Sequence, residues 1–108
     1  MKFHKHHHNN EQTPLHYSAE YGCYEIYEHI MKNSQDKNPK DRNDTTPLHL
    51  AAKNGHLEVC KLILANLKKD FNPPNKFKET PLMLAKNFGH TSICALIASM
   101  YEYYQKRN

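Results

Sequence analysis

The chain has 108 residues and a formal net charge of +4, with 38% hydrophobic and 24% charged residues. That length predicts one compact domain, and no stretch approaches the ~18–20 consecutive apolar residues of a membrane helix, so a membrane span is excluded. Three widely spaced cysteines argue against a disulfide framework and favour a reducing compartment, so we expect a cytoplasmic protein, with a nuclear location as the alternative.

Residues 1–10 form a polar segment that contains His4, His6, His7 and His8. The segment lacks an apolar core of ~7–15 residues, so it is not a secretory signal. Clustered imidazoles can bind Ni²⁺ or Zn²⁺, but no cysteine or carboxylate stands nearby at the spacing of a zinc finger. We therefore expect a disordered, histidine-rich tail at 1–10, a folded domain at 11–108, and neither a metal site nor a cofactor.

Three segments of the chain resemble one another at a nearly constant spacing. They are TPLHYSAEYG at 13–22, TPLHLAAKNG at 46–55 and TPLMLAKNFG at 80–89, so that Thr-Pro-Leu recurs after 33 residues and again after 34. Apolar residues of the following stretches align as well, namely Ile26 with Val59 and Ile93, and Ile30 with Ile63 and Ile97. A period of this length is typical of a repeat protein and predicts units at about 11–40, 41–74 and 75–108.

Each unit carries the signals of two short helices. A threonine precedes a proline, as an N-cap precedes a proline at the first helical position, and a glycine closes the helix. These residues are Thr13, Pro14 and Gly22, then Thr46, Pro47 and Gly55, then Thr80, Pro81 and Gly89. A second helix is predicted from apolar residues at helical spacing, as at Val59, Leu62, Ile63 and Leu67. Because helices this short are marginal alone, the pairs are expected to stack.

The linkers at 34–45 and 68–79 are predicted to form extended hairpins. Asn38-Pro39 and Asn72-Pro73-Pro74 prevent a helix there, and Asn43-Asp44 suits a turn tip. The extra residue of the second unit falls between Leu64 and Asp70.

These motifs resemble the ankyrin repeat over about residues 9–100. The resemblance is carried by Thr-Pro-Leu-His at 13–16 and 46–49, its variant Thr-Pro-Leu-Met at 80–83, Ala51-Ala52, Gly55-His56 and the 33-residue period. It implies an all-α solenoid of stacked helix-turn-helix units joined by β-hairpin-like loops. It also implies that His16 and His49 bond the motif threonine and a neighbouring repeat's backbone, and that His56 and His90 are structural. Lys78 stands where the family usually has glycine.

The outer units depart from the middle one in ways that suggest capping. His29 replaces the leucine found at positions 62 and 96, and Met83 and Lys86 replace the motif histidine and the second alanine. A lysine is tolerable at position 86 if no further repeat packs there. The aromatic residues Tyr101, Tyr103 and Tyr104 fit either a cap that packs on the third unit or a contact for another chain.

The three cysteines are expected to remain reduced. Cys60 and Cys94 occupy the same repeat position and are predicted to lie in the core. Helices of adjacent units pack at ~8–10 Å, which exceeds the ~7 Å Cα limit of a disulfide. Cys23 lies at the corner between two helices and is expected to be more exposed.

No catalytic motif is present: a phosphate-binding glycine loop, GxSxG, HExxH and paired CxxC are all missing from the sequence, so we expect no enzyme. The resemblance to ankyrin repeats implies instead a protein-interaction module, an adaptor or scaffold, that binds through its concave face. We expect another protein as the partner, with no membrane or nucleic acid involved, and either a monomer or part of a longer ankyrin array.

The resemblance places that face on the hairpin tips and the exposed side of each first helix. The matching residues are Tyr21, Lys40, Arg42, Asn43, Lys53, Asn54, Lys76, Phe77, Asn87 and Phe88, with Gln12, Glu20, Thr45 and Glu79 beside them. Tyr21, Asn54 and Phe88 are expected to form a row. Exposed phenylalanines beside basic residues have the character of a binding patch, although the same side chains could merely decorate a solvated face.

A rival hypothesis is a metal- or nucleic-acid-binding protein that uses the histidine-rich tail and the basic second half. The stretch 46–108 carries a net charge of +5, from nine basic and four acidic residues. Lysine outnumbers arginine by 13 to 2, however, and sequence-specific base recognition usually depends on arginine.

Overall fold

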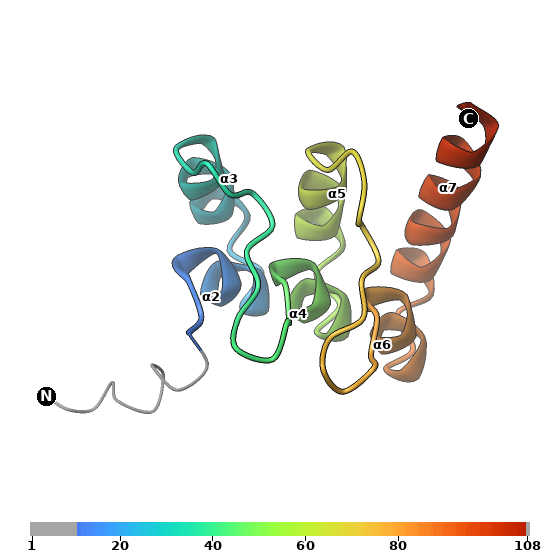
Figure 1. The fold of residues 1–108 in the computed structure, drawn as a ribbon, viewed down its shortest axis with the longest axis horizontal. Coiled ribbons are helices and arrows are strands. Elements are labelled where there is room, and N and C mark those ends of the chain that lie inside the picture. The colour runs from blue at the N-terminus through green and yellow to red at the C-terminus, as the bar shows by residue number, and fades with distance from the viewer. Residues whose placement is uncertain (1–10, 108) are drawn as a thin grey trace, which may run out of the picture.

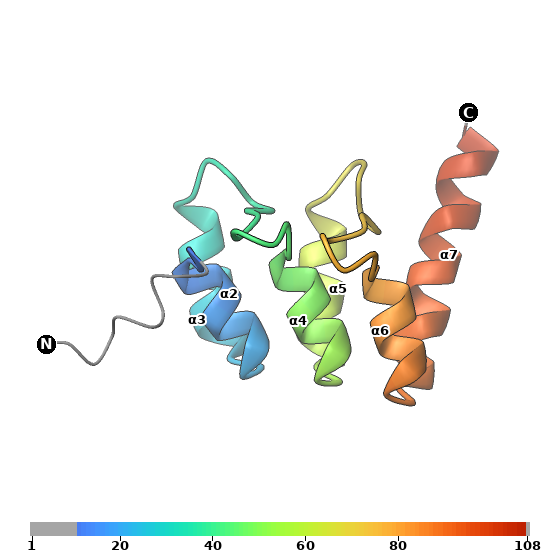
Figure 2. The same cartoon turned by 60° about the horizontal axis from the view of Figure 1, so that its bottom comes forward.

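The computed structural model describes residues 11–107, and the predicted tail at 1–10 lies outside this range. The described part folds into helices α2 (Pro14–Glu20), α3 (Tyr24–Lys32), α4 (Pro47–Lys53), α5 (Leu57–Ala65), α6 (Pro81–Asn87) and α7 (Thr91–Arg107), without a strand. The helices form three pairs, with α2, α4 and α6 in one layer and α3, α5 and α7 in the other (Figure 1). Figure 2 shows α2, α4 and α6 side by side in front, with the linkers passing from one unit to the next. The predicted all-α solenoid is confirmed.

The three first helices begin as their sequence predicts. The Thr13 side chain accepts a hydrogen bond from the His16 backbone amide, while the His16 side chain accepts one from the Thr13 amide. Thr46 and His49 repeat this reciprocal arrangement in α4. In α6 only the threonine half remains, because Met83 has no ring nitrogen to accept the second bond.

Each first helix ends at a glycine with a positive φ, and two of these glycines also make room for a histidine. A Cβ on Gly22 would collide with the His56 ring, and a Cβ on Gly55 would lie 2.6 Å from Cε1 of His90. The corner of one unit therefore fits closely against the next unit. The motif glycines serve both the turn and the contact between units.

The core lies between the two helical layers and runs through all three units. Its members include Leu15, Ala19, Tyr27, Leu48, Ala51, Ala52, Val59, Cys60, Ile63, Leu64, Ala85, Ile93 and Ile97. The Tyr27 hydroxyl is buried there without a hydrogen-bond partner, and burial raises the pKa of this phenol. Across the described residues, none of the helices is both long and apolar enough to cross a membrane.

Equivalent positions in the three units are not equally buried. Val59 and Ile93 are each 1% exposed, whereas Ile26, aligned with them in sequence, is 55% exposed. A unit precedes that of Val59 and that of Ile93, whereas none precedes that of Ile26 in the described part of the chain. The sequence alignment of these positions therefore predicted their place in the repeat but not their burial.

The cysteine predictions hold in part. All three cysteines are free, and Cys60 is fully buried, which raises the pKa of its thiol to about 12. Cys94 is only half-buried, so the prediction that it lies in the core is wrong. Cys60 belongs to the middle unit, which has a neighbour on both sides, whereas no further unit follows that of Cys94 within residues 11–107. Cys23 is half-buried at its corner.

Both linkers turn through tight tips rather than paired strands. The amide of Asp41 donates to the Thr45 carbonyl oxygen at 3.0 Å, and the amide of Asn75 donates to that of Glu79 at 2.9 Å. Asp44 and Lys78 occupy equivalent positions with φ values of 62° and 64°. Lys78 therefore adopts the left-handed conformation that glycine would favour, and the second tip keeps the geometry of the first.

The C-terminal tyrosines pack back onto the linker of the second unit. The Tyr101 ring meets Phe71 edge-on at 5.0 Å, and the Tyr104 ring stacks on Phe71 at 5.6 Å. The Tyr104 hydroxyl donates to the Leu67 carbonyl oxygen at 3.2 Å. Of the two alternatives for these tyrosines, the cap holds for Tyr101 and Tyr104, while Tyr103 remains half-exposed.

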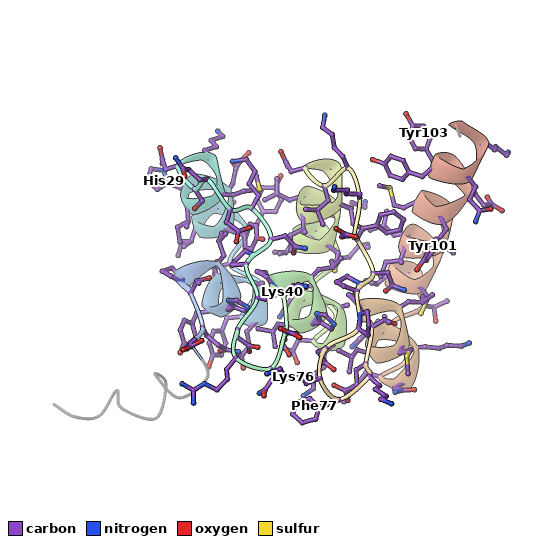
Figure 3. The ribbon with its side chains drawn as sticks, in the orientation of Figure 1. His29, Lys40, Lys76, Phe77, Tyr101 and Tyr103 are labelled. Carbon is purple, nitrogen blue, oxygen red and sulfur yellow. The ribbon has the colours of Figure 1, made fainter. Side chains whose placement is uncertain are left out.

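The other departures of the outer units also lie at the surface. Lys86 and Met83 are exposed on the third unit. His29 is exposed on α3, where the equivalent Leu62 and Leu96 are half-buried (Figure 3). These substitutions place polar or flexible side chains where a neighbouring unit does not cover them.

Candidate partner-binding surface

A hollow of about 180 Å³ lies between the two hairpin tips and the first helices of the second and third units. We call it the central hollow. Its lining residues are Gln12, Asp41, Asn43, Thr45, His49, Leu50, Lys53, Asn75, Phe77, Glu79 and Leu84. They come from all three units, so the hollow exists only when the units are stacked.

Two buried side chains hold the hairpin tips that form one wall of the hollow. Oδ1 of Asp41 accepts hydrogen bonds from the amides of Asn43 and Thr45 at 2.8 and 2.9 Å. Oδ1 of Asn75 makes the equivalent bonds in the next tip, to Phe77 and Glu79. Each tip is therefore fixed by a side chain that mimics a backbone turn.

The two tips are also bonded to each other. The amide of Lys76 donates to the Asn43 carbonyl oxygen at 2.8 Å, and Nδ2 of Asn75 donates to the Thr45 hydroxyl at 3.3 Å. Hydrogen bonds between the two tips therefore hold this wall of the hollow together, and the tips are not independent loops.

His16 and His49 join the first helices to the tips that follow them. Nδ1 of each ring accepts from a threonine amide, so Nε2 carries the proton and donates forward. The acceptors are the carbonyl oxygens of Thr45, at 2.7 Å from His16, and Glu79, at 2.9 Å from His49. Burial lowers the pKa of both imidazoles and thereby keeps them neutral in this arrangement. The structural roles predicted for both residues are confirmed.

His56 and His90 make the opposite connection, back to the preceding unit. Nε2 of His56 bonds the Glu20 carbonyl oxygen, and Nε2 of His90 bonds that of Lys53, both at 2.9 Å. Nδ2 of Asn54 also donates to the Glu20 carbonyl oxygen, at 3.1 Å. The structural roles predicted for the two histidines are confirmed, and Asn54 adds a further contact between units.

Large aromatic side chains stand exposed around the hollow. Phe77 is 63% exposed on the second tip and Phe88 is 54% exposed at the end of α6. Nζ of Lys53 lies 5.6 Å from the centre of the Phe88 ring, within the range of a cation–π contact. Figure 3 shows Lys76 and Phe77 together at the tip of the second linker, away from the helices.

The structure brings only some of the predicted site residues together. Asn43, Lys53 and Phe77 line the central hollow, and Arg42 and Lys76 flank them on the tips. Tyr21, Asn54, Asn87 and Phe88 are exposed at the ends of the first helices. Arg42 is also engaged with Glu11, at 3.5 Å.

Lys40 lies apart from these residues. It lines a separate hollow of about 500 Å³ formed by the segments 36–40 and 66–73. The resemblance placed Lys40 on the hairpin tip. In the structure Lys40 lies just before the tip, beside the loop that follows α5.

Several residues of the hollow were not predicted. Asp41, Asn75, Leu50 and Leu84 line it from buried or half-buried positions. The signal for Asp41 and Asn75 was present, because each is an Asx residue two positions before the residue whose amide it binds. Leu50 and Leu84 gave no such signal, since an apolar helix residue is ordinarily assigned to the core.

No group of three histidine, cysteine or acidic side chains within the described residues could hold a metal ion. The cluster of His4, His6, His7 and His8 lies outside those residues.

Stacked pairs of short helices, bonded unit to unit through histidines and hollowed on one side, define a helical repeat protein. A family model described as ankyrin repeats (3 copies) matches residues 2–75, more than half of the sequence, and the chain belongs to the ankyrin repeat family. The third unit, α6 and α7, lies beyond the matched residues and repeats the same fold. Comparison with curated proteins gave no match.

Proposed function

We propose that this protein is a non-enzymatic adaptor that binds another protein through the side that carries the central hollow. Ankyrin repeats are generally protein–protein interaction modules. The observation that carries the proposal is exposed Phe77, which lines a hollow with a fixed wall together with Lys53, and exposed Phe88, whose ring lies beneath Lys53. Binding energy in protein interfaces is concentrated in a few residues, and aromatic side chains are enriched there.

The bonded tips support the same proposal on energetic grounds. A surface that is already ordered loses little conformational freedom when a partner binds, so more of the contact energy appears as affinity. The Asp41 and Asn75 turns and the bond between Lys76 and Asn43 order this wall before any partner arrives.

We further propose that the protein acts in the cytoplasm. Three free thiols, of which Cys60 is fully buried, support a reducing compartment. No observation on the described residues favours the metal- or nucleic-acid-binding alternative.

Two triple variants test the proposal. Replacing Arg42, Phe77 and Phe88 with Ala removes the exposed anchors of the hollow side, and replacing Glu25, Glu58 and Lys61 with Ala alters the opposite side. All six residues are exposed, so both variants should melt close to the parent protein. Partners are captured by affinity purification, identified, purified and titrated calorimetrically against each variant. We expect the first variant to lose binding and the second to retain it.

The reverse pattern, with binding lost only in the Glu25, Glu58 and Lys61 variant, would show that the partner binds to the second helices. If the captured partner is a nucleic acid and its affinity falls steeply with added salt, the nucleic-acid-binding hypothesis replaces the proposed function.

A further inference from the structure

We propose that the partner presents an acidic polypeptide segment with one aromatic or large aliphatic side chain, and that the segment binds over the second and third units. This inference rests on the proposed function and specifies the chemistry of the partner.

Three of the four basic side chains around the hollow have no ion-pair partner among the described residues, and the fourth, Arg42, pairs with Glu11. Lys53, Lys76 and Lys78 are exposed, and none of them forms an ion pair with any described residue. Lys53 lies over the Phe88 ring instead. Three cations therefore remain available on this side of the second and third units.

The carboxylates of the same region are largely engaged. Both oxygens of Asp41 accept hydrogen bonds, from Gln12 and from the first tip, and the side chain is buried. Oε1 of Glu79 accepts from Asn75 at 3.1 Å. Asp44 is the remaining acidic residue of the first tip, and it is half-buried. Asp41 and Glu79 are thus engaged within the tips, which leaves Asp44 against the three lysines Lys53, Lys76 and Lys78 on this side.

The first unit differs in this respect. Its exposed Glu11 pairs with Arg42 at 3.5 Å, and Glu20 lies at the end of α2. On this side the first unit contributes carboxylates, of which Glu11 is already paired, whereas the second and third units contribute the unpaired lysines. An acidic segment is favoured only over the latter two units.

The hollow has room for one side chain. Its volume of about 180 Å³ is below the ~300–1,000 Å³ of pockets that hold drug-sized ligands, and an apolar cavity of ~150 Å³ can hold a benzene ring. Leu50, Leu84 and Phe77 give it apolar walls. One ring or branched aliphatic group can insert there while neighbouring carboxylates reach the lysines.

A nucleic acid matches these three lysines less well than an acidic peptide does. Nucleic-acid grooves follow the phosphate backbone with a continuous row of basic side chains. Here Asp44 and Glu79 lie on the same two tips as Lys76 and Lys78, while Lys53 is the last residue of α4. A peptide can space its carboxylates to avoid them, whereas a phosphate backbone carries a charge at every nucleotide.

Selection from a phage-displayed library of random twelve-residue peptides tests the inference on the full chain. We expect the enriched peptides to carry Asp and Glu on both sides of an aromatic or large aliphatic residue. Synthetic versions of them should bind more weakly as salt is added. The variant Lys53→Glu/Lys76→Glu should weaken that binding at least tenfold, measured by fluorescence polarisation.

A matched variant controls for overall charge. Lys61→Glu/Lys68→Glu makes the same change in net charge at exposed positions of the second helix and its following loop, and it should leave the affinity within twofold of the parent. If both variants weaken binding equally, the attraction is unspecific and the inference is wrong.

The remaining outcomes separate this inference from the proposed function. Peptides that lose binding in the Arg42, Phe77 and Phe88 variant but carry no acidic excess would overturn the acidic chemistry and leave the binding side intact. If the selected peptides bind both hollow-side variants as well as the parent, or if no peptide is enriched, both the acidic chemistry and the binding side are overturned. A twenty-nucleotide oligothymidylate that displaces the selected peptides would favour a nucleic acid instead of a protein segment.

Discussion

The middle unit and the two outer units differ at the histidines that connect them. The middle unit has His49, which bonds forward to the third unit, and His56, which bonds back to the first. The first unit has only the forward residue, His16, and the third has only the backward one, His90. Cys23 and Met83 occupy the two remaining positions.

Each contact between units therefore includes the same pair of histidine bonds, one at each end of a first helix. His16 and His56 join the first unit to the second, and His49 and His90 join the second to the third. Two separated bonds fix the orientation of one unit on the next, and with it the shape of the central hollow. The outer units lack only the histidine that would point away from the stack.

The largest effect is expected from the core of the middle unit. Ile63→Ala removes a side chain that is 1% exposed, which should cost about 2–5 kcal/mol of the ~5–15 kcal/mol that stabilises a small domain. We expect the whole array to unfold, as followed by circular dichroism during urea titration. Ile30→Ala, at the equivalent but half-buried position of the first unit, should cost less. A cooperative melt of the Ile63 variant close to that of the parent would contradict this.

The next effect isolates one histidine bond. His49→Ala leaves the Thr46 amide and the Glu79 carbonyl oxygen without their side-chain partner, which should cost about 1–3 kcal/mol. Met83→Ala, at the same repeat position in the third unit, should change stability by less than about 0.5 kcal/mol, because Met83 is exposed and makes no such bond. If His49→Ala and Met83→Ala lower the free energy of unfolding equally in chemical denaturation, His49 does not stabilise the protein through these two bonds.

Acidification should loosen the same contacts. Burial lowers the pKa of His16 and His49 below 6.5, although the nearby Asp41 and Glu79 partly oppose it. Below pH 6.5 the unfolded chain takes up protons that the folded chain does not, so stability is complete above that pH and falls as the pH approaches the lowered values. The urea midpoint should be lower at pH 5.5 than at pH 7.5. A midpoint that rises on acidification would exclude neutral histidines in the fold.

The smallest effect compares the two hairpin tips. Lys78 has a φ of 64°, a conformation that costs a residue with a Cβ ~1–2 kcal/mol, so Lys78→Gly should raise stability by about 0.5–1 kcal/mol. Asp44→Gly should gain less, because aspartate tolerates this conformation better. Thermal melts of the two variants measure the difference. A loss of stability in the Lys78 variant would indicate that its side chain contributes more than its backbone strain costs.

The features that could be predicted from the sequence are those set within one unit. Thr46 and Pro47 start a helix and Gly55 ends it through interactions spanning a few residues, so local chemistry was sufficient. The roles of His16 and His49 followed from the resemblance, which already encodes contacts between units.

Features that depend on which units are neighbours could not be predicted in the same way. Ile26 and Cys94 match buried residues of the middle unit in sequence, yet Ile26 is 55% exposed and Cys94 is only half-buried. The central hollow requires Asn43 and Phe77 from different tips to meet, and their separation of more than thirty residues carries no local signal. The hollow that Lys40 lines is formed with residues 66–70 and Pro73, and these distant neighbours likewise gave no local signal.

The most direct test of the account is to map a bound segment on the ¹⁵N-labelled protein by NMR. A peptide selected on the full chain is titrated in, and the backbone amide shifts are followed residue by residue. We expect the largest changes to cluster at Asn43, Lys53 and Phe77, with α5 and the outer side of α7 unchanged. Changes concentrated on α5 or α7, with the amides around the central hollow unmoved, would contradict it.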